Sequence, residues 1–592
     1  MFKFKISYIA LAAALTSTFA SADPSSYTHT SGTKVIDIEK PNAAGVSHNM
    51  YREFNVDSKG VLLNNSGTDS VHGSFGNMPK NNNLTAGNAK VILNEVLSNK
   101  ASTLNGFIEV NGQKADVIVA NPNGITCSGC SFINTNKSIL TTGKVALSET
   151  GAIDKITVTG GKITVKGTGM EAADSYVMLL ADAIAINSTV NAKNALISAG
   201  NATITPETGV VTSAEKTAGL METLFPQNSI DISQLGGIKA NSIKMVGNNL
   251  GFGVRNSGTI ATNNQLIMTS YGTLTNEGTI ASKGAGTQFV AVSGFSNSGS
   301  ITTDNATLVK SGGWLTNKGT IHSDAQLQLS AQTTLENKGT AEGLGALTVA
   351  ANTDITNYAG AKLVSNGQVM ISALNNVDNA GSVAGQNITA FFSGSDLRST
   401  GSMTAGNNVI IQSVKEETFS TGAINNAGTL SGTNIALQTL GDISQTGSVE
   451  AVQALVTSSS TLTNSGDMAG NYVNVSNSWT NNSGNIQAGN MDITASRELL
   501  NDGTLSANNN MSLITGQDGT IVNHNSINAA GTLVMTTGKV VNGGYRCGFM
   551  NWSTCGVGTL TANQLNLTSS QSYAQDMGGK QNFKYTSVNT VK

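Results

Sequence analysis

The four cysteines have the side chains that are best suited to specific chemistry in this sequence. Cys127 and Cys130 stand close together, and so do Cys547 and Cys555. In an exported chain, an even number of cysteines in close pairs predicts two local disulfides. A redox-active Cys-x-x-Cys would need a βαβ setting with a helix after its first cysteine, and the sequence shows none. A zinc site would need a second pair of ligands, and the nearest histidines are isolated.

A turn of distinctive composition lies just before the first cysteine pair. Its residues are Asn121, Pro122, Asn123 and Gly124, and Ile125 follows. Proline fixes its own φ, and asparagine and glycine tolerate positive φ, so these residues predict a tight turn. The apolar run before the turn and the alternating segment after it are both typical of strands. By itself the pattern indicates only a β-turn between two strands.

The composition excludes several classes of protein. Charged residues make up 12% of the chain, about half the usual share, and the net charge is −3. No basic stripe is present, which argues against a nucleic-acid partner. Aspartate and arginine are scattered, and no acidic pair recurs at one repeat spacing. We therefore expect no enzyme, and we assign no catalytic, cofactor-binding or metal-binding residue.

The amino terminus has the features of a secretory signal. Lys3 and Lys5 form a positive region, and the apolar stretch Ile6–Phe19 follows. Small residues after this stretch predict cleavage between Ala22 and Asp23. The apolar run is too short and too rich in serine and threonine for a membrane anchor. No later segment offers about 18 apolar residues, so we expect an exported, soluble protein.

Several segments outside the repeats can be interpreted only coarsely. Residues 34–66 contain short β-type runs broken by glycine and asparagine. Residues 23–33 are polar, and we expect them to be disordered or loosely docked. Residues 91–97 fit a short helix or a strand, and residues 206–230 fit a helix or a loop. Residues 569–592 are polar and lack the repeat pattern, which is typical of an end cap.

From Gly253 onward, a unit of the form Asn-x-Gly-x-apolar recurs along the chain. Most successive glycines of this unit are 18 to 21 residues apart, and one gap, from Gly401 to Gly428, is longer. That gap holds the charged run Lys415–Glu417 and predicts a bulge or loop. A fixed period near 20 residues indicates a solenoid. The repeat glycines are 258, 278, 299, 319, 339, 360, 381, 401, 428, 447, 466, 484 and 503.

The repeat favours an all-β fold, a right-handed parallel β-helix. A leucine-rich repeat would need a leucine frame and a helical side, and neither is present. We place asparagine and glycine at the turns because both tolerate left-handed backbone, and we expect the asparagines to bond from coil to coil. All six prolines lie at or before Pro226, which agrees with a β ladder in the repeats, since proline removes a ladder hydrogen bond.

With the signal, the solenoid and the turn in place, the sequence resembles the exoproteins of two-partner secretion, the filamentous-haemagglutinin-like family. The motifs that carry the resemblance are Gly45–Asn49, Phe54–Val56, Leu63–Ser66, Asn121–Ile125 and Gly253–Gly258. The Cys-Ser-Gly-Cys after Ile125 is similar to the subgroup that holds secreted haemolysins and contact-dependent inhibition exoproteins.

The resemblance implies four regions and one partner. It implies a signal peptide at 1–22, a two-partner secretion domain at 23–262, haemagglutinin-type repeats at 263–540, and a disulfide loop with a cap or tail at 541–592. A dedicated outer-membrane β-barrel transporter would recognise the second region in the periplasm, with Asn121–Ile125 as the secretion motif. The chain would then cross unfolded and fold outside, coil by coil.

The same resemblance implies a secreted or surface-exposed adhesin of the haemagglutinin type. Its receptor would lie on a host-cell or bacterial surface, and a carbohydrate is one candidate. The alternatives are a haemolysin or cytolysin, which would need a membrane-active region, and a truncated stalk of the contact-dependent growth inhibition type. The sequence shows no recognisable toxin domain.

Overall fold

The computed structural model describes residues 23–213, 228–415, 418–547, 553–555, 557–570 and 579–590. The predicted signal peptide lies outside these residues. So does the centre of the loop between Cys547 and Cys555.

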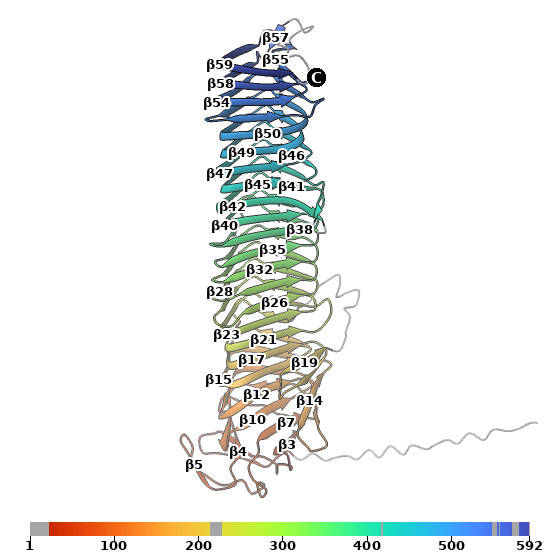
Figure 1. The fold of residues 1–592 in the computed structure, drawn as a ribbon. Coiled ribbons are helices and arrows are strands. Elements are labelled where there is room, and N and C mark those ends of the chain that lie inside the picture. Colours follow the sequence, from red (N-terminus) through yellow and green to blue (C-terminus); the bar gives the residue numbers. More distant parts are fainter. Residues whose placement is uncertain are drawn as a thin grey trace, which may run out of the picture.

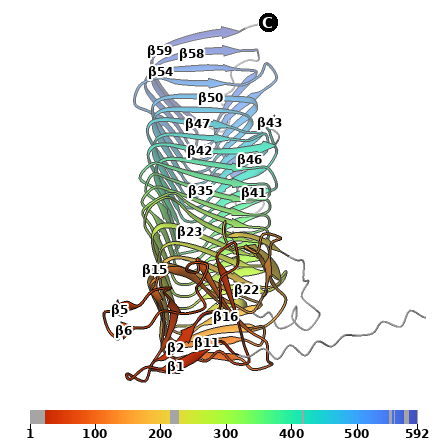
Figure 2. The same cartoon turned by 90° about the horizontal axis from the view of Figure 1, so that it is seen from below.

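The described chain forms one rod of stacked coils, with the amino-terminal region at one end and the carboxyl-terminal strands at the other (Figure 1). All its regular elements are β-strands. Strands pair in parallel with their counterparts one coil away, as β27 (Gly294–Asn297) does with β24 (Thr273–Asn276) and β30 (Trp314–Asn317). Figure 2, seen from below, shows how the coils stack into successive layers. The prediction of an all-β chain wound into a parallel β-helix is confirmed.

Alternate side chains of each coil point into one continuous core. On one side of the rod, Leu315, Leu335, Ile355 and Val377 stack in register on successive coils, and all four are buried. This core cluster extends from Ile36 to Leu567. From Leu335 to Asn464, the strands that carry this side of the repeats are β33 (Leu335–Asn337), β36 (Ile355–Asn357), β39 (Val377–Asn379), β41 (Asp396–Ser399), β44 (Ala423–Asn426), β46 (Asp442–Gln445) and β48 (Thr461–Asn464).

The repeat asparagines also point inward, and they form a ladder of amides. Asn297 Nδ2 donates to Asn317 Oδ1 at 2.9 Å, and Asn317 Nδ2 donates to Asn337 Oδ1 at 2.9 Å. These side chains are buried, so the ladder supplies the partners that buried amides need. The predicted bonding from coil to coil is present. The unbroken runs of the ladder are Asn256, Asn276, Asn297, Asn317, Asn337, Asn357 and Asn379, and then Asn464, Asn482, Asn501, Asn523 and Asn542.

The reason for glycine at the repeat positions differs from the one we predicted. Left-handed backbone does not explain them, because Gly360 alone among the repeat glycines of the described chain has a positive φ. A Cβ atom on Gly319 would instead lie 2.0 Å from the carbonyl oxygen of Gly299, one coil earlier. Gly339 stands in the same relation to Gly319. Close approach between successive turns therefore selects glycine at this position.

The long gap in the repeat forms an outward extension of one coil. Strand β42 (Ser402–Lys415) continues past the coil and pairs in antiparallel fashion with β43 (Thr418–Phe419), where Val414 lies opposite Phe419. Glu416 and Glu417 lie outside the described residues. The expected bulge is therefore a short strand pair.

Both ends of the rod are more regular than we predicted. Strand β1 (Ser26–Thr28) is not loosely docked, because it pairs in antiparallel fashion with β2 (Lys34–Asp37). At the other end, β59 (Lys580–Thr590) adds one more strand to the stack by pairing in parallel with β58 (Thr559–Ser569). An end coil leaves backbone N–H and C=O groups unpaired. A polar segment can therefore gain backbone hydrogen bonds there without apolar side chains.

The glycine column gives a direct test of the packing between coils. Gly319→Ala should lower the free energy of unfolding by about 1–3 kcal/mol, because the new Cβ would meet the backbone of the previous coil. Chemical denaturation followed by circular dichroism measures the effect. Gly73→Ala is the control, since a Cβ there meets no atom within 4 Å, and the change should stay within about 0.5 kcal/mol. Equal effects at the two sites would contradict the account of the column.

Candidate functional site

The turn at residues 121–124 forms a corner of an early coil. It joins β10 (Ala115–Ala120) to β11 (Ile125–Ile133). Strand β10 pairs in parallel with β7 (Val91–Val96), which settles residues 91–96 as a strand. It also pairs with β12 (Thr135–Thr141) in the next coil. Neighbouring coils therefore hold the turn from both sides.

Asn121 is fully buried and connects this corner to the previous coil. Its Nδ2 donates to the carbonyl oxygen of Lys100 at 2.9 Å and to Ser102 Oγ at 3.0 Å. Its Oδ1 accepts hydrogen bonds from the backbone N–H and from Nδ2 of Asn123, both at 3.0 Å. The side chain therefore caps the turn, and it also joins two coils inside the fold.

Only the middle of the motif reaches the surface. Pro122 and Asn123 are exposed, while Gly124 and Ile125 are buried. Asn123 Nδ2 donates to the carbonyl oxygen of Ser98 at 2.7 Å. Gly124 has a φ of 115°, which favours glycine at this position. Within the folded protein, a partner could contact the Pro122–Asn123 edge but not the Asn121 side chain.

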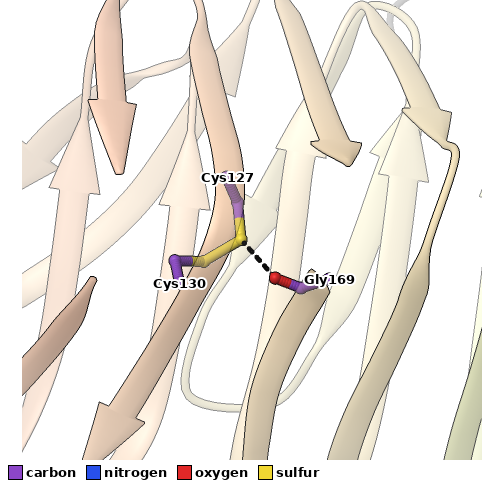
Figure 3. The surroundings of a disulfide bond; sticks show 3 residues. All are labelled: Cys127, Cys130 and Gly169. Atoms are coloured by element: carbon purple, nitrogen blue, oxygen red, sulfur yellow. Dashed lines mark hydrogen bonds between the residues drawn. A yellow bond between two sulfur atoms is a disulfide. The ribbon is translucent and has the colours of Figure 1, made fainter. Parts of the chain in front are cut away.

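The first cysteine pair lies directly after this turn, and both cysteines belong to strand β11 (Figure 3). Cys127 and Cys130 are joined by an S–S bond of 2.05 Å, and both are buried. Gly129 lies between them with a φ of 84°, and the pairing of β11 with β15 (Lys162–Ala181) shifts register at this point. Cys127 Sγ lies 3.3 Å from the carbonyl oxygen of Gly169. The bulge allows both sulfur atoms to face the core.

The second cysteine pair lies on a short antiparallel strand pair near the end of the rod. Strand β56 (Tyr545–Cys547) pairs with β57 (Ser553–Cys555), with Cys547 opposite Ser553 and Cys555 opposite Tyr545. The side chains of these cysteines lie outside the described residues. The predicted second disulfide therefore stays a prediction.

An antiparallel sheet, which we did not predict from the sequence, covers the outer face of the coils around the turn. It consists of β13 (Lys144–Leu147), β14 (Ile153–Val158), β18 (Ala202–Thr205) and β19 (Val210–Ser213). Ile156 and Ile204 from this sheet share a second core with Ile118, Ile139 and Met178 from the coils. The coil strands are consequently apolar on both faces, which accounts for the continuous apolar run at residues 117–120. This apolar run was the feature of the sequence from which a covering layer could have been predicted.

A small cavity lies at the margin of this covering sheet. Its volume is about 240 Å³, and Asp116, Lys137 and Glu207 line it together with aliphatic side chains. Burial raises the pKa of the Asp116 carboxyl, and the charge of Lys137 opposes this shift. Residues 210–213, which we expected to be helix or loop, are strand β19, and residues 214–227 lie outside the described chain.

The known proteins similar to this chain decide its family. Residues 13–282 match the family model described as the TPS secretion domain. The chain belongs to the two-partner secretion exoproteins. Proteins of this family pass through the periplasm and are then secreted or surface-exposed. This protein is accordingly secreted or surface-exposed.

Two relatives of this exoprotein are much longer than the chain. The 16S rRNA endonuclease CdiA of Enterobacter cloacae is 31% identical in an alignment of 564 residues, which covers 91% of this chain and 16% of that protein. The tRNA nuclease CdiA of Yersinia mollaretii is 39% identical over 252 residues, or 42% of this chain and 8% of that protein. The nuclease activities in their names belong to proteins that the chain matches only in small part.

A solved structure is also similar to part of this chain. The crystal structure of the filamentous hemagglutinin secretion domain is 30% identical and covers 50% of this exoprotein and 96% of its own chain, with a TM-score of 0.39.

Two further properties concern the described ranges alone. They contain no helix of the length and apolarity that a membrane span requires. Their His, Cys, Asp and Glu side chains form no group of three that could hold a metal ion.

The buried disulfide can be tested on secreted protein. Mass spectrometry of unreduced peptides should find Cys127 bonded to Cys130. Both sulfur atoms are buried, so a mild reductant should leave the bond intact in folded protein and cleave it only in denaturant. Labelling with a thiol reagent before and after denaturation measures this difference. Free thiols at both positions in native secreted protein would contradict the prediction.

Proposed function

We propose that this exoprotein is a rod-shaped adhesin of the haemagglutinin type, exported through a dedicated outer-membrane β-barrel transporter. The observation that carries the proposal is the continuity of the secretion domain with the rod. Strand β21 (Gly237–Gly247) pairs in parallel with β23 (Thr259–Ser270), and β23 pairs in the same way with β25 (Thr279–Ser282). A folded secretion domain thus serves as the first layers on which the repeats stack.

A solenoid suits export of an unfolded chain. Each coil contacts mainly its neighbours, so a coil can fold on a finished one as soon as it emerges. The observed disulfide encloses only Ser128 and Gly129, and it therefore joins no distant parts of the chain. Local closure of this kind leaves the unfolded chain nearly linear.

The secretion motif is best recognised before the chain folds. Asn121 would offer its whole amide to the transporter in the unfolded chain, whereas the folded corner buries it. Pro122 and Asn123 stay accessible in both states. We assign Asn121–Ile125 to recognition by the periplasmic part of the transporter on this basis.

The described residues support binding better than catalysis. Charged side chains of the rod pair with neighbours on its outer surface, as Arg255 does with Asp231 and Lys338 with Glu336. Long rows of threonine, serine and asparagine face solvent between these pairs. Such a surface suits many weak polar contacts with a host-cell or bacterial receptor, of which a carbohydrate is one candidate.

A second function is favoured by one specific observation. The relative that matches 91% of this chain is named 16S rRNA endonuclease CdiA, and CdiA proteins are contact-dependent inhibition exoproteins. Under this alternative the rod would be a stalk that displays another segment and would need no receptor of its own. The cytolysin alternative rests only on the Cys-x-x-Cys subgroup.

Three assays separate these functions. Secreted protein should agglutinate red cells, or bind host or bacterial cells, without lysing them. Lysis would favour the cytolysin. Growth arrest of neighbouring bacteria by cells that produce the protein would favour the stalk. Heat-denatured protein is the control for nonspecific adhesion in each assay.

Two buried asparagines provide a matched test of the export step. Asn121 and Asn317 each donate two hydrogen bonds from Nδ2 to the adjacent coil. Their replacement by alanine should therefore cost similar stability, about 1–3 kcal/mol each. Asn121→Ala should nevertheless keep the protein in the periplasm, where it is degraded, while Asn317→Ala should be secreted. Immunoblots of periplasm and culture supernatant, with the transporter present, measure the difference.

Similar secretion of both variants would remove the recognition role from Asn121. Pro122→Ala and Asn123→Ala extend the test, since both positions are exposed in the folded protein. Loss of export in these variants would support recognition of the motif itself.

A further inference from the structure

The amide ladder of the rod is interrupted at two positions, Ser399 and Gln445. Both occupy the place that asparagine holds in the flanking coils, as the strand register shows. The lengthened coil with β42 and β43 lies between them. This segment therefore combines two departures from the repeat.

At the first interruption, serine is too short to continue the ladder. Asn379 Nδ2 reaches Ser399 Oγ only at 3.4 Å, compared with 2.8 Å for the preceding contact from Asn357 to Asn379. On the next coil, Asn426 Oδ1 is buried and accepts no hydrogen bond from the described protein. One acceptor is thus left without the amide donor that it has elsewhere.

At the second interruption, the longer side chain of glutamine places its amide beyond the position that the asparagine amides occupy. Asn426 Nδ2 donates to Gln445 Oε1 at 2.8 Å, so the ladder enters this residue normally. Gln445 Nε2 then reaches the carbonyl oxygen of Asp467 at 3.5 Å. Asn464 Oδ1, the next acceptor of the ladder, is buried without a partner.

Unpaired buried polar atoms concentrate in this part of the rod. Within the described ranges six buried side-chain N or O atoms lack a hydrogen-bond partner, and four of them lie between residues 426 and 477. They are Asn426 Oδ1, Thr457 Oγ1, Asn464 Oδ1 and Asn477 Nδ2. Each such atom costs stability in the folded state, because unfolding would return it to water.

We propose that the coils from Ser399 to Asn464 form a joint, at which the rod opens before its flanking coils do. In a solenoid, stability is approximately a sum over coils and the interfaces between neighbouring coils. Two interfaces with lost amide bonds, separated by one intact interface between Asn426 and Gln445, therefore create a local minimum of stability. The joint divides the repeats into two cooperative blocks, and it does not depend on the function of the rod.

Hydrogen exchange on the full secreted chain tests the joint. Backbone amides of β44 and β46 should exchange at least tenfold faster than those of β33 and β36, which belong to the unbroken ladder. Peptide-resolved mass spectrometry at several exchange times gives both rates in one experiment. Equal protection of the two regions would overturn the proposal.

Matched variants assign the effect to the ladder. Ser399→Asn with Gln445→Asn should restore the missing donors and slow exchange in β44 and β46 about tenfold or more. Both changes introduce the residue that flanking coils already carry, so the fold should tolerate them. Asn317→Ser should create the opposite effect, with faster exchange in β30 and β33. Repaired protein that exchanges at the original rate, or an Asn317→Ser rod that stays fully protected, would show that the ladder does not set local stability.

Discussion

The close approach of successive turns at the Asn-x-Gly corner is the constraint on which the rod depends. A carbonyl oxygen of one coil lies too close to the corresponding glycine of the next coil for a Cβ atom to fit. At Gly319 the Cβ would lie 2.0 Å from the carbonyl oxygen of Gly299. The same close stacking carries the asparagine amides into the interior at hydrogen-bonding distance from one another. Because glycine and asparagine lie two residues apart, one short motif secures both the backbone contact and the buried polar partners. Regular spacing of the motif then fixes the number of residues in most coils.

The amino-terminal domain solves the same problem with different residues. Asn121 lies at a coil corner, is buried, and bonds to the previous coil through Lys100 and Ser102, much as a ladder asparagine bonds to its neighbour. Asn111 Nδ2 donates to Asn64 Oδ1 at 2.9 Å, which makes a single contact of the ladder type. The covering sheet adds what the repeats lack, a second apolar layer outside the coils. The secretion domain is therefore a β-helix whose outer face is partly buried, and its motif is part of the internal bonding of that helix.

Local sequence features predicted the parts of this structure that depend on a repeating pattern. The glycine period, the absence of proline after Pro226 and the alternating strands indicated the β-helix and the stacked asparagines. The cause of the glycine column could not be seen, because it depends on the distance between coils and not on the φ of one residue. The burial of Asn121 likewise depends on residues 98–102 of another coil. Strands β1 and β59 were missed because backbone pairing at an open end requires no apolar pattern.

The direction of the ladder relates the fold to its proposed route of export. In every contact of the two unbroken runs of the ladder, the earlier coil provides the Nδ2 donor and the later coil the Oδ1 acceptor. When folding proceeds from the amino terminus, each finished coil consequently presents an amide donor to the chain that arrives next. The Oδ1 of the next asparagine can accept a hydrogen bond from this donor, and that bond fixes the register of the arriving coil. At Ser399 the finished coil presents a hydroxyl in place of an amide, and the following coil must find its register from apolar packing and backbone pairing alone. The residue at this one position thus affects both the stability of the finished rod and the order in which its coils are secured.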